Sequence, residues 1–140
     1  MMNILFDINV ILDSLLDRKP YGHIAALLIN AVEESIINGF LSADSVTTLF
    51  YLIQKVKNKN QAKETIKLLL DIFEISPVNR NILQEAINID FNDFEDAVVY
   101  QSAFLSNCNG IVTSNTKDFK KSKIHIYNPK ELLNAITYKS

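Results

Sequence analysis

The sequence predicts an α/β fold built on a parallel sheet. Short apolar segments with strand character recur along the chain, and segments with helical periodicity separate them. Strands that alternate with helices in this way lie parallel, with each helix crossing back over the sheet. We find no internal repeat, low-complexity tract or linker, so residues 1–140 are expected to form a single domain.

Apolar spacing and chain-breaking residues predict the elements of the first half of the chain. The first apolar run has strand character, whereas later apolar residues recur at the spacing of a helical face. Asn38 and Gly39 are expected to end one helix, and Pro77 to close a strand. The expected elements are a strand at 3–6, helices to about 17 and over 23–37, an extended piece at 40–45 with a helix to 56, a helix at 62–73 and a strand at 74–76.

The second half predicts the same alternation and contains an acidic helix start. The segment NIDFNDFEDAVVYQSAFLSNCNG combines aspartates with a helical apolar face, and Gly110 is expected to end this helix. Its buried face is predicted to carry Phe94, Ala97, Val98 and Leu105. The other expected elements are a short helix at 82–87, a buried strand at 111–113, a polar loop at 114–121, a strand at 124–127 and a helix opened by Pro129.

Composition argues against a membrane protein, a disulfide-stabilised protein and a strongly basic nucleic-acid binder. The formal net charge is -2, so any contact with a polyanion must be local or bridged by a metal ion. Apolar runs are too short to span a bilayer, and no secretory signal precedes Asp7, which predicts a cytoplasmic location. Cys108 is the only cysteine, so neither an internal disulfide nor a cysteine-built zinc site is expected.

Polar side chains follow two of the predicted strands. Asp7 and Asn9 come directly after the first strand, and Asn115 and Asp118 lie in the loop after the strand at 111–113. Ligands of an open parallel sheet bind beyond the carboxyl ends of its strands, where loops from separate strands converge. These two strand ends are therefore expected to face each other.

The acidic helix adds carboxylates to the same region. Asp93 and Asp96 are spaced i, i+3 near its start, so both can point into one space, and Tyr100 continues this stripe. A pocket lined by Asp7, Asp96 and Asp118, with amide oxygens nearby, suits a hard divalent ion such as Mg²⁺ or Mn²⁺. Carboxylates held this close repel one another, and a cation removes that penalty.

Each of these residues also has a purely structural interpretation. Asp93 can cap the acidic helix, and Asp7 can cap the helix that follows the first strand. Turn formation explains the residue types at 113–115 equally well. Asp13, Asp17 and the four lysines within 117–123 are interpretable as solvated charges, although lysines beside a metal site would also hold phosphates.

Three segments together resemble the PIN-domain family of metal-dependent nucleases. They are FDINVILD, DFEDAVVYQSA and GIVTSNTKDF, in this order and at these intervals. The chain is most similar to small bacterial single-domain members grouped with the ribonuclease toxins of toxin-antitoxin pairs. The resemblance implies a three-layer α/β/α fold with a parallel sheet of about four or five strands. It also implies bound Mg²⁺ or Mn²⁺ and cleavage of RNA phosphodiesters by a metal-activated water.

The resemblance assigns roles to particular residues. Asp7 would be the metal ligand of the first strand, with Asn9 as its hydrogen-bonding companion, and Asp96 the carboxylate at the head of the later helix. Asn115 falls where many members carry their last acidic residue, and Asp118 follows in the same loop. The catalytic set is thus Asp7, Asp96, Asn115 and Asp118, the metal ligands are Asp7, Asp93, Asp96 and Asp118, and the substrate-binding set is Asn9, Thr113, Ser114, Lys117 and Lys120.

One departure from the family pattern leaves a second function open. Much of the family carries a Glu where this chain has Thr48, so fewer negative charges are available to hold a second ion. Asp44, Asp93 and Asp118 would be the compensating carboxylates. The alternative is a catalytically weak or inactive PIN-like binding module that acts through protein or RNA partners.

A different enzyme class and several partners also need to be considered. An aspartyl-phosphate phosphatase would use Asp7 as nucleophile, but its second aspartate would be Asn9, which cannot serve as the acid. The expected partners are RNA, a cognate antitoxin protein and a second copy of the chain. Apolar residues around Phe40, Phe50 and Tyr51 would supply the homodimer surface.

Overall fold

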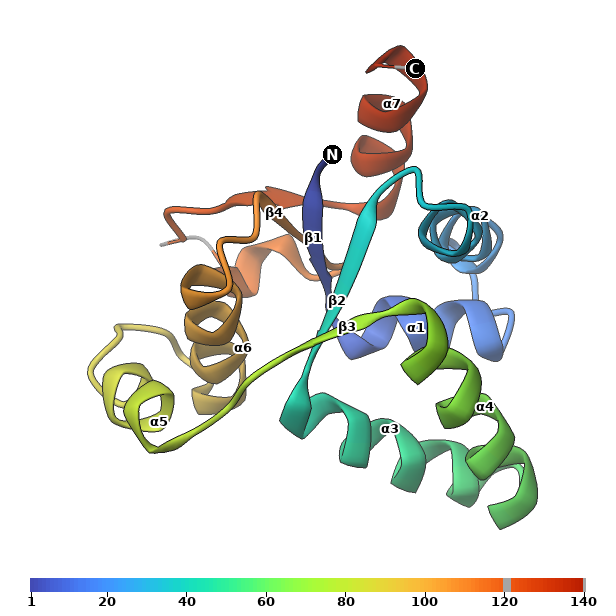
Figure 1. Cartoon of the computed structure of the whole chain (residues 1–140), viewed down its shortest axis with the longest axis horizontal. Coiled ribbons are helices and arrows are strands. Elements are labelled where there is room, and N and C mark those ends of the chain that lie inside the picture. The colour runs from blue at the N-terminus through green and yellow to red at the C-terminus, as the bar shows by residue number, and fades with distance from the viewer. Residues whose placement is uncertain (120–121, 140) are drawn as a thin grey trace.

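The computed structural model contains a five-stranded parallel sheet as the middle of three layers (Figure 1). It describes residues 1–119 and 122–139. The strands lie in the order β3-β2-β1-β4-β5, and each neighbouring pair is parallel. They are β1 (Asn3–Phe6), β2 (Asn38–Ser42), β3 (Glu74–Ser76), β4 (Gly110–Val112) and β5 (His125–Tyr127). The predicted α/β/α fold with four or five parallel strands is confirmed.

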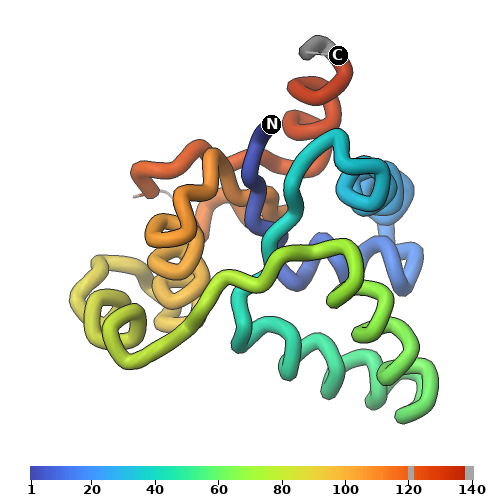
Figure 2. The backbone as a smooth tube through the Cα atoms, viewed as in Figure 1, coloured from blue at the N-terminus to red at the C-terminus, as the bar shows by residue number. Residues whose placement is uncertain are grey.

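Seven α-helices within the described residues cover the two faces of the sheet. On one face α1, α2 and α7 pack together beside the α3–α4 hairpin, and on the other face lie α5 and α6 (Figure 2). The helices are α1 (Ile8–Leu15), α2 (Gly22–Glu33), α3 (Ala43–Val56), α4 (Lys59–Ile72), α5 (Arg80–Ala86), α6 (Phe94–Leu105) and α7 (Pro129–Lys139). A short 3-10 helix, η1 (Thr116–Phe119), lies between β4 and β5.

The central strand β1 is buried on both faces. Ile4 and Phe6 pack into the core beneath α1, α2 and α3, whereas Leu5 packs into the second core with residues of α6. Successive side chains of a strand point to opposite faces, so a strand covered on both sides needs a continuous apolar run. Asp7 is the first polar side chain after this run, which places it where the chain leaves the core.

The predicted end of the second helix is wrong. Helix α2 ends at Glu33, and Ser35 adopts a positive φ of 60° just beyond it. Asn38 and Gly39 instead open β2, where they pair with Asn3 and Ile4 of β1. A Cβ on Gly39 would lie 2.7 Å from the Phe73 ring, so this glycine permits close packing over the strand and does not stop a helix.

Helix α6 also differs from the prediction. Ala97 and Val98 are buried as expected, but Phe94 and Leu105 are each 46% exposed. The helix ends at Leu105, and Gly110 begins β4, where a Cβ would lie 2.6 Å from the Tyr127 ring. Both glycines that were predicted to end helices therefore lie in strands. Glycine is needed at these positions because the packed aromatic rings leave no room for a side chain.

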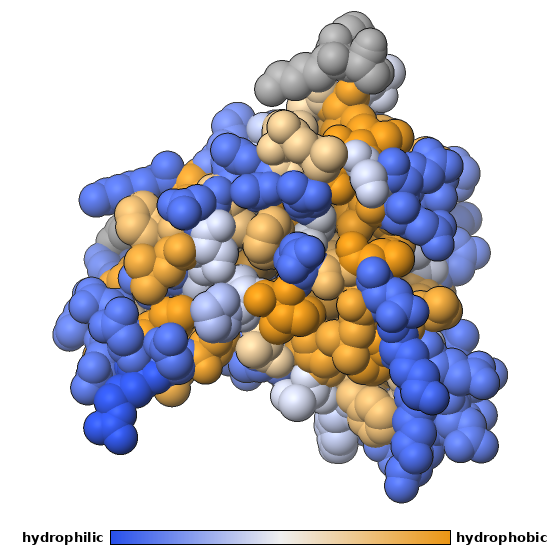
Figure 3. Space-filling view, in the orientation of Figure 1, coloured by the Kyte–Doolittle hydropathy of each residue, from blue (hydrophilic) through white to orange (hydrophobic). Residues whose placement is uncertain are grey.

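The surface mixes polar and apolar side chains. In the view of Figure 3, apolar residues gather over the middle of the face and hydrophilic residues lie around it. The edge strand β3 contributes Ile75, which is 39% exposed, but a strand of three residues offers little backbone for pairing with another chain. No helix in the described part of the chain combines the length and hydrophobicity needed to cross a membrane.

Candidate active site

The strand order brings two polar loops side by side. The order of the strands reverses between β1 and β4, and open parallel sheets bind ligands at the carboxyl ends of strands at such a point. Asp7 leaves β1 here and Thr113 leaves β4, while the Asp7 N–H still donates to the Val112 carbonyl at 3.0 Å. The two strand ends lie together, as the sequence predicts.

Asp7 is fixed by a hydrogen bond from the neighbouring strand end. Thr113 has no exposed surface, and its hydroxyl donates to Asp7 Oδ2 at 2.8 Å. The same hydroxyl accepts from the Asn115 N–H at 3.0 Å, so the turn interpretation of this segment is also confirmed. Asp7 occupies the N-cap position of α1 without a regular cap hydrogen bond. The Asn9 side chain and the backbone N–H groups of Ile8 and Asn9 also favour its charged form, and its carboxylate lines the pocket described below.

The start of α6 brings three carboxylates to the same place. Asp93 is the N-cap residue, and its Oδ1 accepts from the Glu95 N–H at 2.8 Å, which confirms the capping interpretation. Asp93, Glu95 and Asp96 nevertheless all line the pocket described below. Val99 follows Asp96 on this wall, whereas Tyr100 is buried and its hydroxyl accepts from the Lys123 N–H at 3.2 Å. The prediction that Tyr100 continues the pocket-facing stripe of Asp93 and Asp96 is therefore wrong, since Val99 takes that place.

The first turn of α3 forms the third wall. Asp44, Ser45 and Thr48 line the pocket, and the Thr48 hydroxyl donates to the Asp44 carbonyl at 3.3 Å. Asp44 Oδ1 is buried, and within the described residues it has no hydrogen-bond partner. A buried carboxylate oxygen without a partner is unfavourable unless a ligand satisfies it.

These elements enclose one small acidic pocket of about 180 Å³. Six carboxylates line it, from the start of α1, α3, α6 and the loop containing η1. They are Asp7, Asp44, Asp93, Glu95, Asp96 and Asp118. Asn9 lines it as well. In Figure 1 the helices α1, α3 and α6 all begin at this end of the sheet.

Burial raises the pKa values of two of these carboxylates, and neighbouring negative charges add to the rise at Asp96. The pKa of Asp96 rises from 3.8 to about 7, first because burial disfavours the charged form and then because Asp93 and Asp118 lie nearby. The charges of Asp7 and Glu95 add smaller effects in the same direction. Burial also raises the pKa of Asp7, against the opposing hydrogen bond from Thr113. The pocket concentrates negative charge that the described residues do not neutralise.

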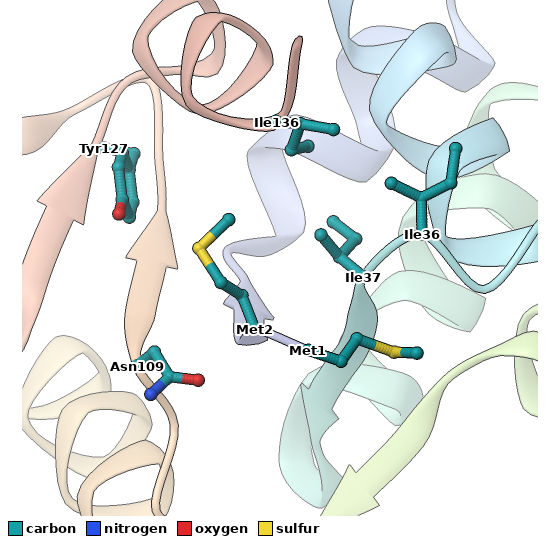
Figure 4. A pocket seen from close by; sticks show the side chains of 7 residues that line it. All are labelled: Met1, Met2, Ile36, Ile37, Asn109, Tyr127 and Ile136. Atoms are coloured by element: carbon teal, nitrogen blue, oxygen red, sulfur yellow. The ribbon is translucent and has the colours of Figure 1, made fainter. Parts of the chain in front are cut away.

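A larger cavity at the other end of the sheet lacks such chemistry. It measures about 590 Å³ and lies near the amino ends of β1, β2 and β4 (Figure 4). Among the described residues, its lining is mostly apolar and contains no carboxylate. The side chains are Met1, Met2, Ile36, Ile37, Asn109, Tyr127 and Ile136. Catalytic groups meet at the carboxyl edge, so the smaller acidic pocket is the candidate active site.

Several residues predicted for the site lie outside the pocket lining. Asn115 and Lys117 are exposed in the loop after β4, and Ser114 is partly buried there, but none of them lines the pocket. Lys120 lies outside the described residues. The sequence prediction did not include Ser45 and Glu95. Both residues lie in the first turn of a helix that begins at the carboxyl edge of the sheet. That position is the signal by which they could have been predicted.

Residues 3–117 match the family described as the PIN domain, so the chain belongs to the PIN-domain family. Among its relatives, the chain is 29% identical over 133 residues to "Ribonuclease VapC1" of Aquifex aeolicus (strain VF5), covering 89% of each chain.

Solved structures show the same fold. A toxin-antitoxin complex from Klebsiella pneumoniae gives a TM-score of 0.67 at 19% identity, over 90% of this chain and 97% of the other. VapBC2 from Rickettsia felis, bound to a DNA fragment from its promoter, gives a TM-score of 0.67 at 16% identity, over 91% of this chain and 98% of the other. DNA-bound VapBC from Salmonella typhimurium gives a TM-score of 0.68 at 15% identity, over 92% of this chain and 99% of the other. The chain is thus a PIN domain related to the VapC proteins.

Proposed function

We propose that this protein is a metal-dependent endoribonuclease and the toxin of a toxin-antitoxin pair. The observation that carries the proposal is the convergence of six carboxylates in one pocket at the point where the strand order reverses. A pocket of this kind suits a divalent ion and a phosphodiester substrate. Membership of the PIN-domain family and similarity to a protein named as a ribonuclease support the same activity.

The pocket residues fit a hard divalent ion, although the carboxylates are not gathered around a single point. No three His, Cys, Asp or Glu side chains among the described residues are arranged as a metal site. The donors that line the pocket are nevertheless all oxygens, and Asp44 Oδ1 is buried without a partner. Asp7 and Asp96 would hold Mg²⁺ or Mn²⁺, with Asp93, Asp118 and Asp44 as further ligands. A bound ion would activate a water molecule and neutralise charge on the phosphate.

The other residues of the site would position Asp7 or contact the RNA. The 2.8 Å hydrogen bond from Thr113 restricts the rotamers of Asp7, which lines the pocket. We assign the predicted role of Thr113 in substrate binding to this positioning. Asn9 lines the pocket and can donate its amide N–H to a phosphate oxygen. Ser114, Asn115 and Lys117 would contact the RNA strand outside the pocket.

A catalytically weak or inactive binding module is the second candidate. The observation that favours it is Thr48, whose hydroxyl is directed to the backbone carbonyl of Asp44 and adds no charge to the pocket. Such a protein would keep the fold and its partners but would not cleave RNA.

A cognate antitoxin is the expected protein partner in either case. Several solved structures with this fold are toxin-antitoxin complexes, and three of them also contain DNA. A homodimer stays a prediction. Within its predicted surface Tyr51 is 62% exposed, whereas Phe50 packs against the core and Phe40 lies on β2.

The experiment that tests the proposed function is a metal titration with a labelled single-stranded RNA. Purified protein is incubated with increasing Mn²⁺ or Mg²⁺, and Asp96→Asn serves as the control. We expect cleavage that depends on the metal and is lost in the variant. Absence of cleavage together with absence of a metal-induced thermal shift would favour the binding module.

A further inference from the structure

Arg18 projects a cation back toward the acidic pocket. It lies in the turn after α1, and its Nε forms an ion pair with Asp13 Oδ1 at 3.0 Å. Its Nη2 reaches the Asn9 carbonyl at 3.4 Å. Asp13 lies one turn further along α1 than Asn9, so the guanidinium extends along the helix toward the end that begins in the pocket.

The backbone around Arg18 is fixed on both sides. The Arg18 N–H donates to the Asp13 carbonyl at 2.9 Å, and the Arg18 carbonyl accepts from the Gly22 N–H at 2.6 Å. A Cβ on Gly22 would lie 2.9 Å from the Asp13 carbonyl oxygen, so the turn packs directly against α1. The fixed backbone sets where the side chain begins, and the contacts with Asp13 and Asn9 restrict its rotamers, so the guanidinium loses less freedom when it binds a ligand.

Arg18 keeps capacity for a second anion. A guanidinium has about five N–H donors, and the contacts with Asp13 and Asn9 use only part of them. The Arg18 side chain is 42% exposed, whereas Asp13 is only 13% exposed. Among the described residues, Arg18 is the one cationic side chain that hydrogen-bonds a residue of the pocket lining. Six carboxylates there would repel an RNA backbone, so a protein cation beside the pocket would favour binding of phosphates next to the one at the metal ion.

We propose that Arg18 binds a backbone phosphate of the RNA next to the bond held in the acidic pocket, and that Asp13 positions the guanidinium for this contact. This inference rests on the proposed nuclease function. Arg suits the role better than Lys, because its planar fork binds one carboxylate and presents further donors to a phosphate. The contact reads no base and carries no sequence preference.

Binding experiments separate this role from a structural one. Fluorescence anisotropy would follow a fluorescein-labelled single-stranded RNA in Ca²⁺ at several KCl concentrations, after a gel confirms that the RNA stays intact. Arg18→Gln should weaken binding roughly tenfold. It should also reduce the slope of log affinity against log salt by about 0.7, the value for one lost phosphate contact on a single strand. Arg18→Lys should keep most of the slope and lose part of the affinity.

The matched control is Arg80→Gln, since Arg18 and Arg80 are the only arginines of the chain. Arg80 lies at the start of α5 and lines no part of the acidic pocket. This variant carries the same change of charge and should leave both affinity and salt slope unchanged. Thermal melting of each variant identifies any loss of folding, and Arg18→Lys, which keeps the cation, tests the proposal if Arg18→Gln is unstable.

Cleavage kinetics in Mn²⁺ complete the test. Arg18→Gln should raise KM roughly tenfold and leave kcat within about twofold, because the lost contact holds RNA before and during the reaction. Unchanged affinity, salt slope and KM in this variant would overturn the proposal for Arg18, and wild-type cleavage would leave the nuclease function intact. A wild-type protein that neither binds nor cleaves RNA would refute both.

Discussion

Replacement of Asp96 by Asn should stabilise the metal-free protein at alkaline pH. The Asp96 carboxylate has a pKa of about 7 because it is buried among other carboxylates. An acid whose pKa is higher in the folded state binds its proton more tightly there, so stability falls as pH rises from about 4 through about 7. At pH 8 the wild-type protein therefore carries the full cost of this charge, and the neutral Asn removes it.

The size of the effect follows from the change in pKa. A rise from 3.8 to about 7 corresponds to about 4 kcal/mol if taken at full value. Asp96 is only partly buried, and solvent screening reduces the effect to about 1–2 kcal/mol. For a chain of this size the melting temperature should rise by about 4 °C per kcal/mol. At pH 5 Asp96 is already protonated when folded, so the gain should be much smaller.

The assay is thermal melting in EDTA at pH 5 and pH 8, repeated with Mn²⁺. Asp71→Asn on the exposed face of α4 makes the same change in net charge away from the pocket. It removes a negative charge from the last turn of that helix, so any gain should be small and of similar size at both pH values. Mn²⁺ should stabilise the wild-type protein at pH 8 and have a much smaller effect on Asp96→Asn. An Asp96→Asn protein that is destabilised equally at both pH values would refute the electrostatic reasoning.

Three further substitutions test other parts of the structure. Thr113→Val keeps the buried shape but removes the hydroxyl that donates to Asp7 Oδ2. The protein should still fold, and kcat for RNA cleavage should fall about tenfold. Unaltered kinetics would contradict the positioning role of Thr113. Asp44→Asn should lower the affinity for Mn²⁺ about tenfold in calorimetric titration, because one ligand charge is lost, and an unchanged affinity would exclude Asp44 from the metal shell. Gly39→Ala should lower the free energy of unfolding by about 2 kcal/mol in urea, since its Cβ would press on the Phe73 ring; a wild-type midpoint would show that the ring yields.

Local sequence determined the element types and most of their positions. The strands predicted at 3–6 and 74–76 have the observed bounds, because a short apolar run and a following proline are local signals. The helices after them were found from apolar spacing, which depends only on neighbours in the chain. The apolar run before Asp7 predicted a strand, and the polar residues that follow it marked the edge of the sheet at which the site lies.

Tertiary packing decided what local signals left open. Gly39 and Gly110 are ordinary helix stops by sequence, but both pair with Ile4 of β1 and lie in strands, beneath aromatic rings that leave no room for a side chain. The order β3-β2-β1-β4-β5 placed β4 beside β1, which joined Thr113 to Asp7 across 106 positions of the chain. Residue types and spacing therefore showed that carboxylates would gather. Only the packing of α3 and α6 around that strand reversal determined that Glu95 joins them and that Asp44, expected as a compensating carboxylate, lines the same pocket, because side-chain directions depend on how helices cross the sheet.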